Sequence, residues 1–361
     1  MKPLTGYMHG IGIGGWLTNY KRIAVLPPEA RRIISPGDIE HFETYITRED
    51  VKRIASFGMD HIRLCFDQIV IEDSDHPGTY RESGLRYLDR FIEWCRLEGI
   101  NVILNLHKAI GAYCDCRDEN TLLTDPELQA RFIALWETLE RRYHASDAPF
   151  EILNEIAVPD SASWNTLAAK TIAALRRLNP TRKIIIGGIG YNSPDSLRDL
   201  RIFDDANVIY TIHFYGPHEF THQRGILQVH PAIYNRAMPY PGDIERYRDY
   251  HRFMFKNEHA YEQYDRMDRR YIEDALRPAM EFMAEHPDKQ LYFGEFGTIR
   301  HADIRSRENW MRDVIGIAKR EGWAYSVWNY LSTPYDGNRF SLVDDDTREI
   351  LSPELLKIIN P

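Results

Sequence analysis

Two short apolar runs of this chain each end in a glutamate. Residues 150–155 read Phe-Glu-Ile-Leu-Asn-Glu, and residues 291–297 read Leu-Tyr-Phe-Gly-Glu-Phe-Gly. Such runs are typical of strands that are buried on both faces of a parallel sheet, so we expect Glu155 and Glu295 at strand ends. One glutamate in such a place is as readily a solvated charge as a functional group. Two of them supply the pair of carboxyl groups that acid/base hydrolysis requires.

The elements that must position these glutamates alternate between strands and helices. Thr47 and Asp50 form a capping box for a helix over 47–57, and Gly99 ends an amphipathic helix over 83–98. Further helices are expected over 125–143, 162–178, 193–200, 275–284, 303–320 and 353–359. The expected strands cover 7–14, 61–66, 100–106, 150–155, 183–188, 207–214, 291–295 and 323–329. Eight such units predict the α/β class and a (β/α)8 TIM barrel.

One connection breaks this rhythm. Residues 216–290 separate the sixth strand from the seventh, and their middle part is rich in Tyr, Arg, Asp and His. A connection of this length inside a compact domain is usually functional. We therefore expect a single catalytic domain over 1–361, with a helical subdomain inserted at about 216–270, between strand 6 and helix 6, over the mouth of the barrel.

Polar or aromatic side chains stand at the ends of most expected strands. In strand order they are Arg63, His107, Asn154 and Glu155, His213 and Tyr215, Glu295, and Trp328. Each has a structural alternative, because an arginine can pair with a buried acid and a histidine or tryptophan can belong to the core. Catalytic groups of α/β barrels come from the carboxyl ends of several strands. So many polar strand ends together favour a catalytic site.

The composition narrows the class of protein. The chain has 361 residues, of which 43% are hydrophobic and 27% charged, as in ordinary globular proteins. Its formal net charge of −9 argues against a nucleic-acid partner, which requires a basic face. The sequence contains no signal-peptide-like start and no run of eighteen apolar residues. We expect a monomeric, cytoplasmic protein with no membrane partner, unless a leader has been removed.

The cysteines do not form a disulfide framework. There are four of them, at positions 65, 95, 114 and 116, and we expect reduced thiols. Cys114 and Cys116, with His107 upstream, resemble a zinc site only weakly, because structural zinc sites use Cys-x₂₋₄-Cys pairs and four ligands. We expect no metal and no cofactor.

A glycine motif near the start formally matches the dinucleotide-binding pattern. Gly10, Gly12 and Gly15 satisfy G-x-G-x-x-G. No helix is predicted after Trp16, as a nucleotide-binding turn would need. The motif therefore fits a first strand whose glycines allow close packing.

These motifs together are similar to family 5 of the glycoside hydrolases, and within it to cellulase C type bacterial endoglucanases. The resemblance runs from Gly-Gly-Trp at 14–16 to Val-Trp-Asn at 327–329 and includes Leu-Asn-Glu at 153–155 and Gly-Glu-Phe-Gly at 294–297. Asn165, Tyr-Asn-Ser-Pro at 191–194 and His-Phe-Tyr at 213–215 also match. The family has a TIM barrel fold, and the relatives carry a subdomain after the sixth strand.

The resemblance implies a retaining glycoside hydrolase. Glu295 would be the nucleophile and Glu155 the acid/base, since a retaining enzyme holds its two carboxyl groups about 5 to 5.5 Å apart. The remaining roles are expected as follows: Arg63 and Tyr215 hydrogen-bond the nucleophile, Asn154 binds the sugar 2-hydroxyl, His107 and His213 bind sugar or hold the carboxylates, and Trp328 forms a stacking floor. Trp16, Asn19 and Tyr330 are candidates for further subsites, with a core position as the alternative for Trp16.

One departure from the family pattern concerns the third strand. This chain reads His-Lys-Ala-Ile-Gly at 107–111 where the relatives resemble His-His-Ala-Pro-Gly. Lys108 thus replaces a substrate-facing histidine, which leaves the expected catalytic residues in place and bears on subsite preference.

The substrate that the resemblance favours is a β-1,4-glucan or a mixed-linkage β-1,3-1,4-glucan. A β-mannanase, or an exo-acting β-glucosidase working on cytoplasmic oligosaccharides, is an alternative. A metal-dependent barrel hydrolase using His107, His213, Glu155 and Glu295 is a more remote one, because the first strand offers no His-x-His pair. A non-catalytic sugar-binding barrel would have lost one of the two glutamates.

Overall fold

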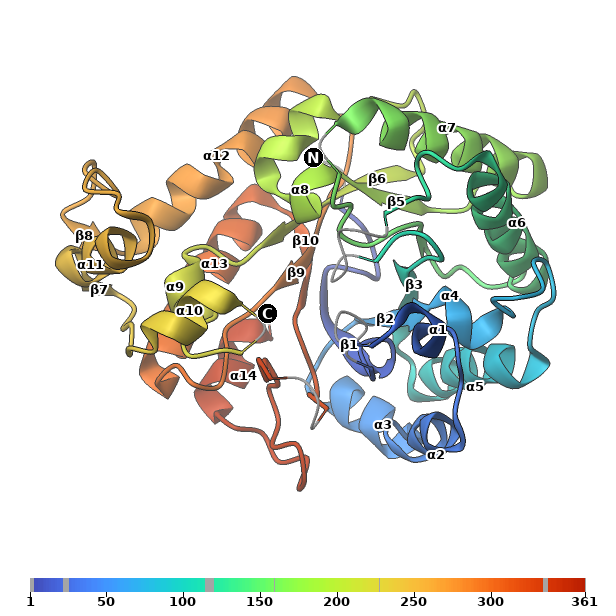
Figure 1. The fold of residues 1–361 in the computed structure, drawn as a ribbon, viewed down its shortest axis with the longest axis horizontal. Coiled ribbons are helices and arrows are strands. Elements are labelled where there is room, and N and C mark those ends of the chain that lie inside the picture. The colour runs from blue at the N-terminus through green and yellow to red at the C-terminus, as the bar shows by residue number, and fades with distance from the viewer. Residues whose placement is uncertain are drawn as a thin grey trace.

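The structure is a computed structural model that describes residues 3–21, 26–113, 120–158, 160–226, 228–333 and 337–360. Its centre is a closed barrel of eight parallel strands, in the order β1-β2-β3-β4-β5-β6-β9-β10 (Figure 1). The strands are β1 (His9–Leu17), β2 (His61–Asp67), β3 (Asn101–Lys108), β4 (Phe150–Glu151), β5 (Ile184–Gly187), β6 (Val208–Phe214), β9 (Leu291–Phe296) and β10 (Ala324–Val327). The predicted TIM barrel is confirmed.

Every second side chain of a strand points into the barrel, and these inward side chains form layers along the barrel axis. The lower interior is an apolar cluster to which neighbouring strands contribute. It consists of Leu4, Tyr7, Ile103, Ile185, Ile209, Tyr292 and Ala324. On β3, two residues beyond Ile103 and therefore on the same inward face, the buried Asn105 begins a polar layer, and its partner in the sheet register is Cys65 of β2. The apolar layer closes one end, and the polar layer faces the mouth.

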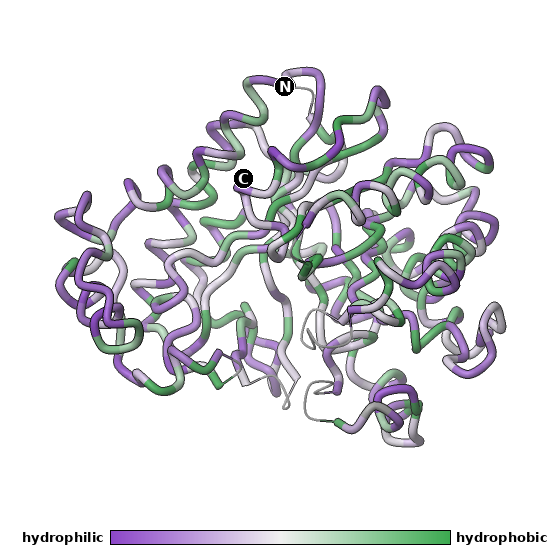
Figure 2. Tube along the Cα trace, turned by 45° about the horizontal axis from the view of Figure 1, so that its top comes forward, coloured by the Kyte–Doolittle hydropathy of each residue, from purple (hydrophilic) through white to green (hydrophobic). Residues whose placement is uncertain are grey.

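Amphipathic helices surround the barrel and bury their apolar faces against the outer side of the strands. Their bounds are α2 (Pro36–Thr44), α3 (Arg48–Ser56), α5 (Glu82–Glu98), α6 (Pro126–Arg142), α7 (Ser161–Leu178), α12 (Arg269–Glu285), α13 (Ile304–Glu321) and α14 (Pro353–Ile359). The connections also hold the short helices α1 (Pro28–Arg31), α4 (Gln68–Ile71), α8 (Ile189–Asn192) and η3 (Pro194–Asp199, a 3-10 helix). Hydrophobic stretches run through the interior and hydrophilic ones lie outermost (Figure 2). Within the described residues, no helix combines the length and hydropathy needed to span a bilayer.

Local signals explain several helix ends. The Asp50 carboxylate accepts hydrogen bonds from both the backbone nitrogen and the hydroxyl of Thr47, each at 2.9 Å, which is the predicted capping box. Gly99 ends α5 in the left-handed conformation, as expected. A second capping box, between Ser35 and Asp38, begins α2, a helix that the sequence analysis did not anticipate.

The long connection between β6 and β9 is not wholly helical. It holds α9 (His218–Thr221), α10 (Val229–Tyr234) and α11 (Ile244–Phe255), but also β7 (Gly242–Asp243) and β8 (Arg266–Met267), which pair antiparallel. The expected helical subdomain between strand 6 and helix 6 is present. The sequence analysis did not predict its two strands, because strands of two residues are too short to show a periodicity.

The outer part of the insertion is attached to α13. α11, β7 and β8 project from one flank of the molecule, beyond α12 and α13 (Figure 1). The insertion is attached to α13 through Tyr240, whose backbone nitrogen donates to Ser306 Oγ at 2.9 Å and whose hydroxyl donates to Asp313 at 2.8 Å. That the insertion covers the mouth stays a prediction. α9 lies nearer the mouth, where His222 packs against Tyr215 at the end of β6.

Candidate active site

A β-bulge turns Glu295 toward the barrel interior. The register between β6 and β9 pairs Ile212 with Phe293 and then His213 with Glu295, so that Gly294 is the extra residue. A side chain at position 294 would meet Thr211 Oγ1 at 2.6 Å, which explains the glycine. Glu295 is 4% exposed and is directed at the centre of the site.

Glu155 reaches the same place from a turn beyond β4. Its φ of 41° lies in the left-handed region, where non-glycine residues are uncommon and where backbone strain often marks a functional position. The segment before it is held by a hydrogen bond from the Asn154 backbone nitrogen to the Leu106 carbonyl at 3.0 Å. The side chain of Glu155 stays 20% exposed, so it faces the opening of the site.

The two carboxyl groups lie close together. An oxygen of Glu155, a ring nitrogen of His213 and an oxygen of Glu295 all lie within 4.8 Å of one another. His213 Nδ1 stands between them, 2.9 Å from Glu155 Oε1 and 3.7 Å from Glu295 Oε2. Inverting glycosidases hold the two groups about 6.5 to 9.5 Å apart to admit a water molecule, and retaining ones hold them about 5 to 5.5 Å apart. The geometry matches the retaining class.

Arg63 forms hydrogen bonds both to Glu295 and to the β4 segment that carries Glu155. Its Nη1 donates to Glu295 Oε1 at 2.5 Å, its Nη2 donates to Asn154 Oδ1 at 2.7 Å, and its Nε and Nη2 form a two-pronged pair with Glu151 at 2.6 and 2.8 Å. Tyr215 donates to the other oxygen of Glu295 at 3.0 Å. Arg63 and Tyr215 therefore fix the orientation of Glu295.

The surroundings set the protonation of these groups. Burial raises the pKa of Glu155 to about 7, although Arg63 and Lys108 oppose that rise. Burial also raises the pKa of Glu295, against the lowering effects of His213 and Arg63. The predicted influence of Arg63 on the Glu295 pKa is thus present but is outweighed by burial. Burial lowers the pKa of His213 to about 4, so this imidazole is neutral at pH 7.

The side-chain amides of Asn19 and Asn154 determine which ring nitrogen of His107 carries the lone pair. Lys108 Nζ donates to Asn19 Oδ1 at 2.6 Å, and Arg63 donates to Asn154 Oδ1. With their oxygens occupied by cations, both amides present their nitrogens to His107 Nε2, at 3.3 Å from Asn19 and 3.5 Å from Asn154. His107 Nε2 must therefore accept, and it carries the lone pair.

The other nitrogen of His107 consequently carries the proton. His107 Nδ1 donates to Asn105 Oδ1 at 3.1 Å. Burial and the nearby Lys108 hold the pKa of His107 well below its usual value, so the ring is neutral. Lys108 thus acts on His107 through Asn19 as well as through its charge.

Trp328, the residue after β10, completes the floor of the site. Its ring lies parallel to His107, with centroids 5.7 Å apart and an angle of 11° between the planes. Gly12 and Gly14 of β1 leave room for it, since a side chain at position 14 would meet the indole at 2.3 Å. The indole remains partly exposed, as a sugar-stacking surface must.

Two aromatic residues lie in the core and not in a subsite. Trp16 is fully buried, donates from its indole nitrogen to the Phe42 carbonyl at 2.9 Å and stacks on Trp94. Tyr330 is also fully buried and donates to Asp50 at 2.8 Å. The subsite prediction is wrong for both, and the core alternative for Trp16 is what the structure shows.

The sequence analysis missed several polar residues that support the site. Glu151 is buried in β4 and balances Arg63, and Asn192 contacts His213 Nε2 at 3.3 Å. The signal for Glu151 was present, because a glutamate inside an apolar strand needs a buried cation. Asn192 is the last residue of α8, the short helix after β5, and its partner could not be read from the chain.

Comparisons with known proteins agree with this geometry. Residues 34–333 match the family described as Cellulase (glycosyl hydrolase family 5). The chain is 35% identical to Endoglucanase C of Acetivibrio thermocellus over 364 residues, covering 99% of this chain and 98% of the relative. This protein belongs to glycoside hydrolase family 5.

A second relative and a solved structure extend the comparison. Cellodextrinase A of Ruminococcus flavefaciens is 28% identical over 325 residues, covering 88% of this chain and 83% of the relative. The barrel also superposes on a solved hyperthermophilic endo-β-1,4-glucanase with a TM-score of 0.74 at 22% identity, covering 99% of this chain and 97% of that one. The structural likeness supports the fold. The protein is a glycoside hydrolase.

Proposed function

We propose that this protein cleaves β-1,4-glucosidic bonds, in β-1,4-glucan or in mixed-linkage β-1,3-1,4-glucan, with retention of configuration. The observation that carries the mechanism is the approach of the Glu155 and Glu295 carboxyl oxygens to within 4.8 Å. The substrate class rests on the 35% identity to an endoglucanase over nearly the full chain.

The first step is attack on the sugar. The Glu295 carboxylate, aimed by Arg63 and Tyr215, bonds to the anomeric carbon, while protonated Glu155 gives its proton to the departing glycosidic oxygen. A pKa of about 7 keeps Glu155 protonated at mildly acidic to neutral pH. The products are a covalent glycosyl-enzyme and a shortened chain.

The second step releases the sugar. Glu155, now ionised, takes a proton from a water molecule, which attacks the anomeric carbon and frees Glu295. Asn154 lies beside Arg63 and suits a hydrogen bond to the sugar 2-hydroxyl, while Trp328 supplies an apolar face under the ring.

Product stereochemistry tests this mechanism. We would follow hydrolysis of cellopentaose by proton NMR and identify the anomer that forms first. Retention gives the β-anomer, and an α-anomer would refute the role of Glu295 as nucleophile. Reducing-sugar release from barley β-glucan, carboxymethylcellulose, mannan and cello-oligosaccharides then ranks the substrates, with Glu295→Gln as the inactive control. Excess chelator in every assay tests the metal-dependent alternative, which requires that activity be lost.

A second candidate function is the cleavage of short cello-oligosaccharides. The 28% identity to Cellodextrinase A favours it. An enzyme of this kind releases reducing ends from oligosaccharides much faster than it lowers the viscosity of a polymer solution. A rapid fall in viscosity at low extents of hydrolysis would exclude it in favour of internal cleavage of polymers.

A further inference from the structure

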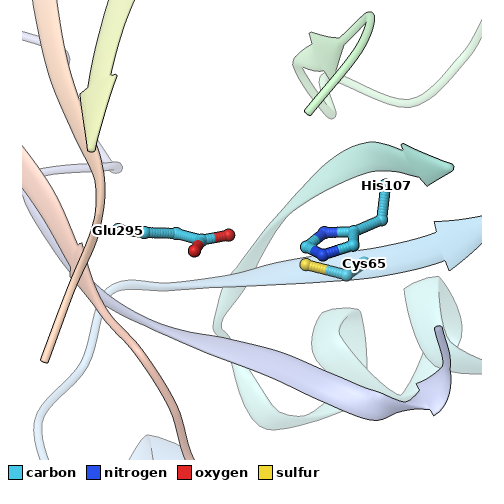
Figure 3. Close-up of side chains that lie close together, drawn as sticks. All are labelled: Cys65, His107 and Glu295. Atoms are coloured by element: carbon cyan, nitrogen blue, oxygen red, sulfur yellow. The ribbon is translucent and has the colours of Figure 1, made fainter. Parts of the chain in front are cut away.

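The proposed nucleophile lies close to two other side chains that can ligate a metal. Cys65 from β2, His107 from β3 and Glu295 from β9 each present a ligand atom, and these atoms all lie within 4.8 Å of one another (Figure 3). We propose that this cluster binds a zinc ion, and that the bound ion reversibly blocks the active site.

The donor set suits zinc. A thiolate, an imidazole and a carboxylate are the ligands that zinc prefers, with water in the fourth position. Donors at the corners of a zinc tetrahedron lie about 3.3 to 3.8 Å apart, so the side chains need to close by no more than about 1.5 Å. In Figure 3 the Glu295 carboxylate is directed toward His107 and Cys65 across the site.

His107 has its proton on Nδ1, where Asn105 Oδ1 accepts at 3.1 Å, and its lone pair on Nε2. The zinc ion would take the place of the Asn19 and Asn154 amide nitrogens, which lie 3.3 and 3.5 Å from Nε2. A partner such as Asn105 on the far nitrogen of a histidine orients it for metal binding. The buried Asn105 Nδ2 has no hydrogen-bond partner among the described residues. Because Asn105 is paired with Cys65 in the sheet register, this amide nitrogen would donate a hydrogen bond to a metal-bound Cys65 thiolate.

The charges also favour a divalent ion. With Glu155 ionised, the site holds the three negative charges of Glu151, Glu155 and Glu295 against the two positive charges of Arg63 and Lys108, which leaves one excess negative charge. The hydrated zinc ion gives up all but one of its waters, the Cys65 thiol releases its proton to solvent, and a zinc–sulfur bond forms. The ion and the thiolate together add one positive charge, which brings the network to neutrality. Arg63 Nη1, 3.5 Å from Cys65 Sγ, supports the thiolate.

The consequence is inhibition. A zinc-bound Glu295 cannot attack the anomeric carbon, so zinc should compete with substrate and be removed by a chelator. A second group, Glu155, His213 and Glu295, is also compact but offers no thiol. Cys65 therefore distinguishes the two positions.

Zinc chloride titrations of glucanase activity test the proposal. Each variant is compared with its own activity in chelator. In Cys65→Ser the half-inhibiting zinc concentration should rise at least about 10- to 100-fold. Cys95→Ser, at a buried thiol of α5, and the double variant C114S/C116S should retain the wild-type sensitivity to zinc.

Unchanged inhibition in Cys65→Ser would overturn the proposal and indicate the Glu155–His213–Glu295 group. Loss of inhibition in C114S/C116S would overturn it in favour of those two cysteines.

Cobalt chloride gives a readout that does not depend on activity. Cobalt bound to a thiolate shows a sulfur-to-metal charge-transfer band in the near ultraviolet, and one equivalent should bind to the wild type. His107→Gln should weaken that binding, and Cys65→Ser should abolish the band. A wild type without the band would refute the site even if the protein hydrolyses glucan. A band in a protein that hydrolyses no glycan would leave the site standing and refute the proposed function.

Discussion

Glu155 and Glu295 are alike in chemistry but differ in their neighbours. Glu295 is fixed by donors on both oxygens, from Arg63 and Tyr215, whereas Glu155 has His213 on one oxygen and remains partly open to the cleft. Donors that contact the charged form of a carboxylate favour ionisation. This difference suits Glu295 to nucleophilic attack and Glu155 to proton transfer.

The pH dependence of kcat/KM should be bell-shaped. Glu155 must be protonated, so activity should fall as pH rises through about 7. Glu295 must be ionised, and because burial raises its pKa, the acid limb should lie above the usual carboxyl range. Initial rates on cellotetraose from pH 3 to 10 check this, and a rate that stays flat through pH 9 would contradict the role of Glu155.

Replacing Lys108 should move the basic limb. The Lys108 ammonium lowers the pKa of Glu155, so Lys108→Met should shift that limb upward by about 0.5 pH unit, with a higher KM because Asn19 loses its anchor. Lys170→Met, at an exposed position of α7, is the matched control and should leave the profile unchanged. A downward shift in Lys108→Met would refute this electrostatic effect.

Removing the acid/base should affect substrates unequally. Glu155→Ala should reduce hydrolysis of β-glucan by about 10²- to 10⁴-fold, because a sugar leaving group needs a proton. A dinitrophenyl cellobioside has a leaving group that departs without one, so its first step should remain fast. Stopped-flow absorbance should then show a burst of dinitrophenol followed by slow turnover. Equal losses on both substrates would mean that Glu155 is not the acid.

At the scale of elements, irregularities in the strands aim the catalytic groups. Strict alternation from Tyr292 would turn Glu295 outward, and the bulge at Gly294 turns it inward. Glycines of β1 likewise leave the space that Trp328 occupies. The barrel strands thus position the side chains through small departures from regular geometry.

Filling that space should impair binding. In Gly14→Ala the new methyl group would meet the Trp328 indole at 2.3 Å and displace it from its place beside His107. We expect KM for cello-oligosaccharides to rise about tenfold, which corresponds to about 1.4 kcal/mol of lost binding. Gly37→Ala in α2, where the nearest atom lies at 3.8 Å, is the control and should be stabilised by up to about 1 kcal/mol. An unchanged KM in Gly14→Ala would mean that Trp328 does not bind sugar.

At the scale of the whole molecule, the insertion extends the barrel sideways and remains attached to α13. Its first helix, α9, borders the site through the contact of His222 with Tyr215. Its outer part is held to the barrel by Tyr240, among other contacts. One part of the insertion, α9, therefore borders the active site, and another part attaches the insertion to α13.

Loosening that attachment should destabilise the insertion without slowing catalysis. Tyr240→Phe removes the hydrogen bond to Asp313 and should lower the free energy of unfolding by about 1 to 2 kcal/mol. Hydrogen exchange of α11 should speed up while kcat stays unchanged. Tyr325→Phe, which loses a bond to the Ile359 carbonyl at the end of α14, is the control and should leave exchange in α11 unaffected. Slower turnover in Tyr240→Phe would show that the outer insertion contributes to catalysis.

The sequence by itself determined the barrel and the groups at its mouth. Buried parallel strands are apolar throughout, so eight such runs separated by amphipathic helices leave few other folds, and any polar residue at their ends is conspicuous. Glu155, Glu295, Arg63 and His107 were all identified in this way.

Only the tertiary structure decided what depends on partners far apart in the chain. The exclusion of Trp16 and Tyr330 from the site, the pairing of Glu151 with Arg63, and the path of the insertion follow from packing between elements. The approach of Cys65, His107 and Glu295 likewise arises because barrel closure brings three separate strands to one axis. Local patterns cannot encode such distances, because they depend on register, bulges and closure.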